Sequence, residues 1–462
     1  MMSSSVEQWA NNELASVDLG DKRRDRRARS ILATLARRPG GSVTGMAEGM
    51  AESSAIYRFL RNDAVQPEAL RAPLRDAALE RLGDEKTVLV PQDTTCLNYT
   101  PHRATTGMGP LGAGDGSKGY GMFVHSAIAI SESGVPLGLL HQQSWSRSKK
   151  VGRKHDRKKR PLEDKESFRW VQTARAVEAA VPADRRLIQL ADREADFFEM
   201  FAEPRLENSF LLVRVYQNRR LEDKERLLWD ELAQLQPALI YNMLVHTSHS
   251  TTARKARLEL RFGPMTILPP CDGVHDEGLE PVTLTAIEVR EIDAPEGADA
   301  IRWQVLTDLP MESVEDARRY VKYYELRWLI ERYHYVLKSG CKIEDSQLRS
   351  FEAIERLLAL FSAVAMRLLW LTYSARKRPD APCTVVFSDI EWQVLYRYHH
   401  EQPPPDQPPR LKDAVLWLAQ MGGFLGRKRD GEPGVKVLWR GLMRLQDIVI
   451  GVLLMGGDVY KG

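Results

Sequence analysis

Two aspartates are placed where they could bind divalent metal ions. Asp93 directly follows the short hydrophobic run TVLVPQ, and Asp192 directly follows the run LIQLA. Because such runs predict strands, each carboxylate is expected at the carboxyl end of a strand, where open α/β sheets gather their chemistry. Two alternatives stay open, because an N-cap residue explains Asp192 and a turn residue explains Asp93 equally well.

A third carboxylate, Glu331, lies in a segment with helical periodicity, residues 314–338. At about 100° per residue, one helix face carries Tyr324, Arg327, Glu331 and Lys338 within an arc of about 60°. That face offers a phenol, a guanidinium, a carboxylate and an ammonium group. The alternative is an exposed Arg–Glu pair worth only tenths of a kcal/mol, with a solvated lysine beside it.

Carboxylates that meet at one site need a counter-charge, and hard oxygen ligands suit Mg²⁺ or Mn²⁺. Two such ions, about 3.5 to 4 Å apart, can activate a water or a 3′-hydroxyl and stabilise the leaving oxygen of a phosphodiester. Tyr324, Arg327 and Lys338 would then hold DNA phosphates beside the metals. The chemistry predicted for these residues is therefore metal-dependent phosphodiester displacement.

The charge distribution supports a nucleic-acid partner. The chain of 462 residues holds 66 Lys and Arg against 63 Asp and Glu, a formal net charge of +3. Residues 18–38 carry a net +5 and residues 147–160 a net +8, so the remainder sums to −10. Concentrated cationic segments in an acidic body are expected where a protein meets phosphate backbones. For residues 147–160 a solvated loop is the alternative.

The composition, 43% hydrophobic and 28% charged, is globular and allows roughly three domains. The four cysteines lie far apart, which argues against a zinc site or a disulfide framework and favours a reducing, intracellular compartment. The N-terminus lacks the apolar core of a signal peptide, and the apolar run 357–366 is too short to span a bilayer. We therefore expect neither export nor a membrane span.

The surrounding sequence predicts the elements that would position these residues. Helical sequence at 16–62, broken at 38–41, predicts a small N-terminal α domain. Strand-like runs at 123–130 and 135–145, joined by the turn 131–134, predict a hairpin. Helices at 162–180 and 194–201 alternate with strands at 187–191 and 209–215. This order predicts an α/β fold, a mixed sheet with helices on both faces.

The rest of the chain adds strands and then helices. Residues 216–309 are rich in strand-like runs and predict a β insertion into the α/β body. Helices are expected at 351–373, 411–421 and 435–454, with a stiff proline-rich linker at 403–409. The predicted domains are 1–70, an N-terminal helical domain; 71–375, a catalytic domain with the insertion at about 217–300; and 376–462, a C-terminal helical region.

Taken together, these residues resemble a known family, the bacterial insertion-sequence DDE transposases of the Tn-five type, within the RNase H-like retroviral-integrase superfamily. The resemblance rests on the spacing Y-(2)-R-(3)-E-(6)-K at Tyr324, Arg327, Glu331 and Lys338. It also rests on the segments LGDKRRDRRA, AIYRFLRN, VPQDTT, GLLHQQSW, EDKESFRW, ADREAD and MGGFLGRKRDG, which are spread over nearly the whole chain.

The resemblance implies an RNase H-like catalytic domain in which Asp93, Asp192 and Glu331 bind two Mg²⁺ ions, replaceable by Mn²⁺. It implies cut-and-paste transposition: hydrolysis at the transposon ends, hairpin formation, hairpin opening and strand transfer into target DNA. Trp303 matches the tryptophan that stacks on a flipped base in the hairpin step. The partners implied are double-stranded DNA and a second copy of the chain, and the location is the cytoplasm of a bacterium, at the nucleoid.

The resemblance also assigns DNA contacts. These residues are Tyr324, Arg327, Lys338, Trp303 and Arg214, and, in the N-terminal domain, Arg23, Arg24, Arg27, Arg58 and Arg61.

Two other functions remain open. The chain could be a domesticated relative that binds transposon ends without cutting, although a pure binder has no need of the three carboxylates and the YREK residues. It could also be an RNase H-like nuclease without strand transfer.

The sequence does not predict a nucleotide-binding site. A G-x-G-x-x-G match at 107–112 contains Pro110 and is followed by no helix, and the sequence has no P-loop. We therefore expect no nucleoside triphosphate as a partner.

Overall fold

The protein divides into two compact units. The computed structural model describes residues 5–38, 40, 42–47, 49–112, 119–148, 160–222, 225–245, 254–270, 278–297, 300–427 and 430–455. The first unit consists of Met1–Glu85, Thr94–Val151 and Leu329–Gly462, and the second consists of Lys86–Asp93 and Gly152–Trp328. The chain passes between the units four times: after Glu85, within a strand after Asp93, after Val151, and at the start of a helix after Trp328.

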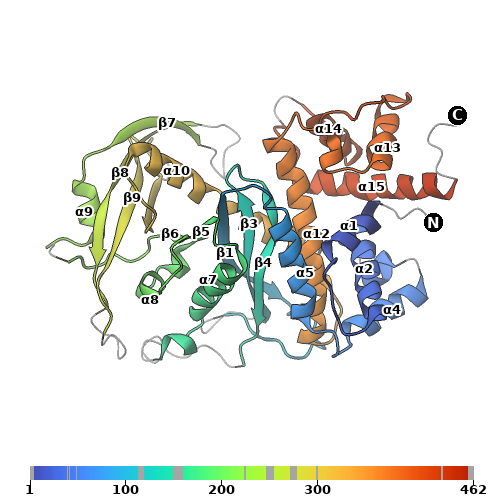
Figure 1. Ribbon diagram of the computed structural model, residues 1–462, viewed down its shortest axis with the longest axis horizontal. Coiled ribbons are helices and arrows are strands. Elements are labelled where there is room, and N and C mark those ends of the chain that lie inside the picture. Colours follow the sequence, from blue (N-terminus) through green and yellow to red (C-terminus); the bar gives the residue numbers. More distant parts are fainter. Residues whose placement is uncertain are drawn as a thin grey trace. The chain divides into compact units, whose positions relative to one another are not determined.

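A mixed β-sheet forms the frame of the second unit (Figure 1). Its strands, in spatial order, are the first part of β1 (Thr87–Asn98), β5 (Arg186–Ala191), β6 (Ser209–Arg214), β10 (Arg302–Thr307), β9 (Val282–Ile292), β8 (Arg254–Ile267) and β7 (Leu239–Val245). The first three are parallel, and from β6 onward each pairing is antiparallel. Because β10 pairs with both β6 and β9, the strands of the insertion continue the main sheet.

Helices cover this sheet and close its core. They are η1 (Leu162–Asp164), α7 (Phe168–Ala180), η2 (Arg193–Ala195), α8 (Phe198–Ala202), α9 (Leu228–Gln234) and α10 (Val314–Glu325). Trp170 of α7, Phe198 of α8 and Leu228 of α9 are buried against Leu211 and Leu306 of the sheet. Burying such side chains stabilises the fold by about 1.5–3 kcal/mol each. The predicted helix 162–180 is interrupted, because its first residues form a separate 3₁₀ turn.

The first unit combines helices with a small antiparallel sheet. Its elements are α1 (Ser5–Glu13), α2 (Lys22–Arg37), α3 (Val43–Met46), α4 (Met50–Leu60), α5 (Pro67–Glu80), the second part of β1, β2 (Gly109–Pro110), β3 (Tyr120–Ser131), β4 (Pro136–Trp145), α11 (Trp328–Tyr335), η3 (Val336–Gly340), η4 (Ile343–Asp345), α12 (Phe351–Lys377), η5 (Cys383–Val385), α13 (Asp389–His400), α14 (Leu411–Met421) and α15 (Val435–Leu454). Strands β3 and β4 form the predicted hairpin, and Gly134 in its turn has a φ of 90° that favours glycine.

The long helix α12 is the spine of the first unit. It contacts α2, α4, α5, β4, α14 and α15, which lie around it in Figure 1. By length and composition α12 could cross a membrane, but 83% of its most apolar window is buried inside the protein. We therefore interpret it as a core helix.

The fold class predicted from the sequence is confirmed. The protein has a mixed sheet with flanking helices, a strand-rich extension of that sheet, and helical N- and C-terminal parts. The boundaries of the three predicted domains remain a prediction. The two compact units follow other boundaries.

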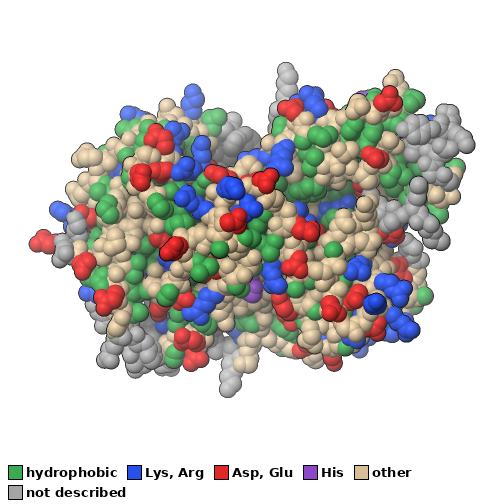
Figure 2. Space-filling view, viewed as in Figure 1, with side chains coloured by type: hydrophobic (Ala, Val, Ile, Leu, Met, Phe, Trp, Pro, Cys, Tyr) green, Lys and Arg blue, Asp and Glu red, His purple; other side chains and the backbone are tan. Residues whose placement is uncertain are grey.

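Figure 2 shows acidic and basic side chains interspersed over one face of the protein, as the small net charge of +3 suggests.

Candidate active site

Asp93 lies in β1 of the second unit, and Asp192 directly follows the adjacent strand β5. Strands β1 and β5 are parallel, with Pro91 opposite Leu190. Asp93 and Asp192 each follow that pair by two residues, and neighbouring strands of a sheet are about 4.8 Å apart. A hydrogen bond of 2.7 Å between the buried amides of Gln92 and Gln189 joins the strands just before the two carboxylates. The two aspartates thus lie at the same end of the stretch over which the two parallel strands pair, and their joint binding of a metal stays a prediction.

Only one of the two aspartates lies at the carboxyl end of its strand, where both were expected. Asp192 does follow the last residue of β5, but Asp93 lies inside β1, which continues to Asn98. The Asp192 Oδ1 atom accepts a hydrogen bond of 2.8 Å from the backbone N–H of Glu194, so the N-cap interpretation is correct as well. The cap occupies one carboxylate oxygen, and Oδ2 remains as a second donor atom for a cation.

Cationic and phenolic groups surround the pair in the second unit. The Arg327 Nη1 atom lies 3.9 Å from Oδ2 of Asp93. Tyr324 is 7% exposed, and the charges of Arg327, Arg214 and Asp192 act on its hydroxyl. Burial raises the pKa of Tyr324 to about 12, so the phenol keeps its proton at neutral pH. Three of the residues that the resemblance assigns to DNA, Tyr324, Arg327 and Arg214, are thus brought together beside the aspartates.

Arg214 itself lies at the end of β6, the next strand of the sheet. Burial lowers its pKa, and its charged neighbours are Arg193, Arg327 and Asp192. Guanidinium groups remain charged at neutral pH despite such a shift, because their intrinsic pKa exceeds 12. Several like charges held close together are stabilised by an anion, and a DNA phosphate would supply one.

The expected single helix over residues 314–338 is wrong. Helix α10 ends at Glu325, and the backbone N–H groups of Leu326 and Arg327 bond three residues back, to the carbonyl oxygens of Tyr323 and Tyr324. A new helix, α11, starts at Trp328 and gives way to the π-turn η3 at Val336. The rotation of 100° per residue therefore does not run from Tyr324 to Lys338, and the calculated 60° arc does not describe the structure.

The remaining two residues of the YREK set belong to the first unit. Glu331 lies in α11 with a partly exposed side chain. The Lys338 Nζ atom donates a hydrogen bond of 2.9 Å to the carbonyl oxygen of Cys96 and lies 3.6 Å from Glu344 Oε1. Because Cys96 follows Asp93 by three residues in β1, Lys338 supports the strand that carries the first aspartate. Its contact with a phosphate remains a prediction.

The donor set fits a hard divalent cation, since it consists of carboxylates only. Among the residues that the structure describes, no three His, Cys, Asp or Glu side chains form a group that could hold a metal ion. Asp93 and Asp192 therefore provide the part of the predicted set that is assembled within one unit, and the participation of Glu331 remains a prediction.

Trp303 lies in β10 of the second unit, opposite Val289 of β9, and is partly exposed. Its two neighbours in the strand, Arg302 and Gln304, both donate to the buried carboxylate of Glu288, at 2.9 and 2.8 Å. The strand around Trp303 is thus held firmly, and its stacking on a base remains a prediction.

The N-terminal helices separate two sets of arginines. Arg23, Arg27, Arg58 and Arg61 are exposed on α2 and around the end of α4, while Arg24 is partly buried and donates to the carbonyl oxygen of Ala64 at 3.2 Å. These five are the residues that the resemblance assigns to the transposon end. The exposure of the four arginines other than Arg24 leaves their side chains accessible to a phosphate backbone.

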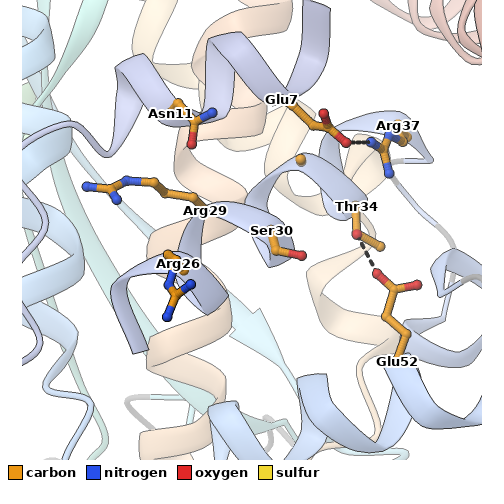
Figure 3. Close-up of a pocket in the computed structure, with 9 residues that line it drawn as sticks. Glu7, Asn11, Arg26, Arg29, Ser30, Thr34, Arg37 and Glu52 are labelled. Carbon is orange, nitrogen blue, oxygen red and sulfur yellow. Dashed lines mark hydrogen bonds and ion pairs between the residues drawn. The ribbon is translucent and has the colours of Figure 1, made fainter. Parts of the chain in front are cut away.

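The other arginines of α2 line a polar cavity of about 450 Å³ between α1, α2 and α4 (Figure 3). Arg37 forms an ion pair of 2.7 Å with Glu7, and Arg29 donates to the carbonyl oxygen of Leu14 at 3.0 Å. Thr34 donates to Glu52 at 2.7 Å. These contacts join the three helices, so the inner arginines stabilise the domain and do not belong to the predicted DNA-contacting set.

The second cationic window is only partly visible. Residues 149–159 lie outside the described part of the chain. Arg147 lies 4.1 Å from the centroid of the Phe123 ring and donates to the carbonyl oxygen of Leu111 at 3.1 Å. This one arginine of the window therefore has a structural role.

Two supporting residues were not recognised in the sequence. Asp196 is buried, and its carboxylate accepts hydrogen bonds from the backbone N–H groups of Tyr216 and Gln217, at 2.6 and 2.7 Å, and from Arg219. It thereby ties the turn after Asp192 to the segment after Arg214. Gln189 interrupts the apolar run LIQLA, and that single polar residue was the available signal for the Gln92–Gln189 bond.

Three known families match successive parts of the chain. Residues 6–65 match the transposase DNA-binding family, residues 206–366 match the transposase DDE domain, and residues 363–457 match the transposase Tn5 dimerisation domain. The DDE match includes Glu331 but begins after Asp93 and Asp192.

One solved structure similar to the chain is the cryo-EM structure of the piggyBac transposase synaptic complex with hairpin DNA. The identity is 10% and the TM-score 0.35, over 100% of this chain and 75% of that chain. Similarity at this level carries no argument about function.

Proposed function

The chain belongs to the insertion-sequence transposases of the Tn5 type, and we propose that it moves its own element by a cut-and-paste reaction. As members of that family do, it binds DNA, forms dimers and acts on DNA as an enzyme of the DDE class. The finer proposal is that a dimer holds two transposon ends, cleaves them through a hairpin and joins them to target DNA. It acts in the cytoplasm of a bacterium, at the nucleoid.

The observation that carries this proposal is the placement of Asp93 in β1 and of Asp192 directly after the adjacent parallel strand β5, with Tyr324, Arg327 and Arg214 beside them. A carboxylate pair beside a cluster of cations is suited to a phosphodiester, since the carboxylates attract metal ions and the cations attract the phosphate.

Asp93, Asp192 and Glu331 would hold Mg²⁺, or Mn²⁺ in its place, with two ions per site. Bound there, the ions would supply the activation of a water or a 3′-hydroxyl and the stabilisation of the leaving oxygen. The chain itself supplies the orientation: the Gln92–Gln189 bond holds the two strands in register, and the backbone of Glu194 directs the carboxylate of Asp192.

The residues around the carboxylates would bind the DNA backbone. The hydroxyl of Tyr324 donates a hydrogen bond to a phosphate oxygen, because its pKa of about 12 keeps the phenol neutral. Arg327 and Arg214 bind the same backbone as charged donors. Lys338 contacts an adjacent phosphate, and Trp303 stacks on the base that is flipped out when the hairpin forms.

The N-terminal helices would recognise the transposon end. Exposed arginines on α2 and α4 bind phosphates and give affinity that falls with salt. The C-terminal helices would join the two copies, because α15 leaves Leu454 82% and Met455 90% exposed at its end. Exposed apolar side chains at a helix end are suited to a protein partner.

The test is an excision assay with the full-length chain and a DNA fragment that carries its own terminal inverted repeats. In Mg²⁺ we expect hairpin intermediates, blunt released ends and, with a target plasmid added, joined products. Binding of the repeats without nicking in Mg²⁺ or Mn²⁺ would identify a non-cutting relative. Cleavage without joined products from precut ends would identify a nuclease without strand transfer.

A further inference from the structure

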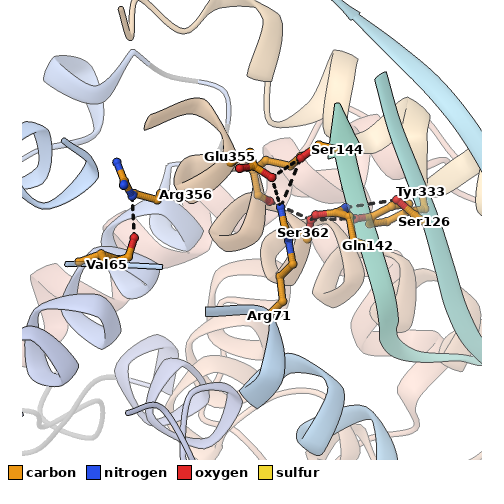
Figure 4. A network of polar contacts seen from close by, with 10 residues as sticks. Val65, Arg71, Ser126, Gln142, Ser144, Tyr333, Glu355, Arg356 and Ser362 are labelled. Atoms are coloured by element: carbon orange, nitrogen blue, oxygen red, sulfur yellow. Dashed lines mark hydrogen bonds and ion pairs between the residues drawn. The ribbon is translucent and has the colours of Figure 1, made fainter. Parts of the chain in front are cut away.

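A closed group of polar side chains lies in the core of the first unit, around the hydroxyl of Tyr333 (Figure 4). Tyr333 comes from α11, Ser126 from β3, Gln142 from β4 and Ser362 from α12. Each of the four side chains is at most 2% exposed. The Tyr333 hydroxyl donates to Ser362 Oγ at 2.8 Å and accepts from Gln142 Nε2 at 3.0 Å.

The other hydrogen bonds complete the group. Gln142 Nε2 also lies 3.2 Å from Ser126 Oγ, and Ser362 Oγ donates to the carbonyl oxygen of Leu358 at 2.8 Å. Every side chain of the group therefore has a partner. Because a buried polar atom that loses its partner is costly, such a network favours one arrangement of the elements that contribute to it.

Helix α11 depends on this arrangement more than a longer helix would. It has 8 residues, the turn at Leu326–Arg327 separates it from α10, and η3 follows it with a backbone bond of 2.7 Å from Cys341 to Val336. Regular α-helical hydrogen bonding therefore continues at neither end. The apolar contacts of Leu329 and Ile330 bury α11 but are not directional, whereas the hydroxyl of Tyr333 is.

Glu331 precedes Tyr333 by two residues, which is about 200° around the helix. The two side chains thus point to nearly opposite sides of α11, and a rotation of α11 that displaces the Tyr333 hydroxyl redirects the Glu331 carboxylate. We propose that Tyr333 is a positioning residue, whose buried hydroxyl fixes α11 so that Glu331 can act as a metal ligand. This inference rests on the proposed function, in which Glu331 binds the metal.

The test compares three variants of the full-length chain. Tyr333→Phe removes only the hydroxyl and keeps the ring, and Ser362→Ala removes the other end of the same bond. Thr372→Val is the matched control, because Thr372 is a buried hydroxyl of α12 that donates within its own helix, to the carbonyl oxygen of Leu368 at 2.7 Å. Using both ends of the bond means that the result does not depend on one variant folding.

Mn²⁺ binding is measured by titration calorimetry on the complex with transposon-end DNA, and end cleavage is measured over a range of Mg²⁺ concentrations. We expect Tyr333→Phe and Ser362→Ala to raise the Kd for Mn²⁺ by about ten-fold or more. Changes of this size are typical when a residue that orients a metal ligand is replaced. Cleavage falls at low Mg²⁺ and recovers partly at high Mg²⁺. A fourth variant, the double variant Tyr333→Phe/Ser362→Ala, is expected to be little worse than either single one, because both changes remove the same bond.

Affinity for the end DNA in the absence of metal stays at the wild-type level in all of them. A Tyr333→Phe protein that binds Mn²⁺ as the wild type does, and only unfolds at a lower temperature as Thr372→Val does, overturns the inference and leaves the proposed function standing. A wild-type chain that binds no Mn²⁺ and cleaves no DNA contradicts the proposed function, and the inference with it.

Discussion

Arg356 of α12 offers a perturbation whose size can be worked out from its contacts. Its guanidinium donates to the carbonyl oxygens of Val65 at 2.7 Å and Leu60 at 3.0 Å, and to Asp63 Oδ1 at 3.1 Å. The Arg356 side chain is 4% exposed, whereas that of Asp63 is 95% exposed. Arg356 therefore ties the end of α4, where Arg58 and Arg61 lie, to the spine of the first unit; its bond to Val65 is drawn in Figure 4.

Replacing Arg356 with Met keeps the apolar stem and removes all three donors. Asp63 is solvated and loses little, but the two carbonyl groups are left without their donors, at a cost of about 1–3 kcal/mol each. We expect the free energy of unfolding to fall by about 2–6 kcal/mol. At about 2–4 °C per kcal/mol for a domain of this size, the Tm falls by roughly 4–24 °C. Affinity for the transposon end falls too, because the end of α4 is no longer fixed.

The measurement is thermal unfolding by circular dichroism, with end binding by gel shift. Arg376→Met is the matched control: Arg376 lies on the same helix but donates to a single carbonyl oxygen, that of Pro433, at 2.9 Å. Its loss should cost about 1 kcal/mol. Equal Tm values for Arg356→Met, Arg376→Met and the wild type would refute the reasoning.

The remaining predictions concern a close helix contact, a buried phenol and an exposed charge. A Cβ at Gly441 would lie 2.0 Å from the carbonyl oxygen of Leu418, so Gly441→Ala should push α15 away from α14 and lower stability by about 1–3 kcal/mol in a denaturant titration. Gly451→Ala on the same helix meets nothing within 4 Å and should be neutral or slightly stabilising; equal losses from both would contradict the packing argument. Because the pKa of Tyr324 is raised to about 12, its phenol is neutral well above physiological pH. The ratio of the wild-type cleavage rate to the Tyr324→Phe cleavage rate should therefore stay constant from pH 7 to pH 10. A ratio that falls towards one in that range would be evidence against a neutral donor. Arg27→Gln should reduce the slope of log K against log salt for end binding by about 0.9, and an unchanged slope would remove Arg27 from the contact.

Sequence patterns predicted the strands but not how they pair. The hydrophobic runs before Asp93 and Asp192 identified two strands of the site, because burial on both faces leaves continuous apolar runs. Their parallel register depends on contacts between segments far apart in the chain, such as the Gln92–Gln189 bond. No local signal carries that information.

The helix around Glu331 shows where periodicity failed. Residues 314–338 keep a helical pattern and contain no Gly or Pro before Gly340, so nothing in the sequence marks the break after Glu325. The break arises where the backbone N–H groups of Leu326 and Arg327 donate hydrogen bonds to carbonyl oxygens three residues back instead of four. This local change leaves the apolar pattern of the sequence intact. The spacing of the YREK residues was nevertheless informative through the family resemblance, since Tyr324 and Arg327 do lie beside the aspartates as that resemblance implies.

Buried polar partners were the least predictable part of the structure. Tyr333 in the sequence is one aromatic residue among several, and its role depends on Gln142 and Ser362, which are distant in the chain. The same is true of Asp196, whose partners come from the segment after the next strand.

The central claim is that the carboxylates of Asp93, Asp192 and Glu331 perform the cutting. Its most direct test is the rate of transposon-end cleavage by Asp192→Asn in Mg²⁺, compared with Glu194→Gln. Glu194 is an exposed neighbour whose side chain pairs with Arg169, outside the proposed metal set. We predict that Asp192→Asn binds the ends as the wild type does and leaves them uncut, while Glu194→Gln still cuts. Cleavage by Asp192→Asn at the wild-type rate would contradict the account.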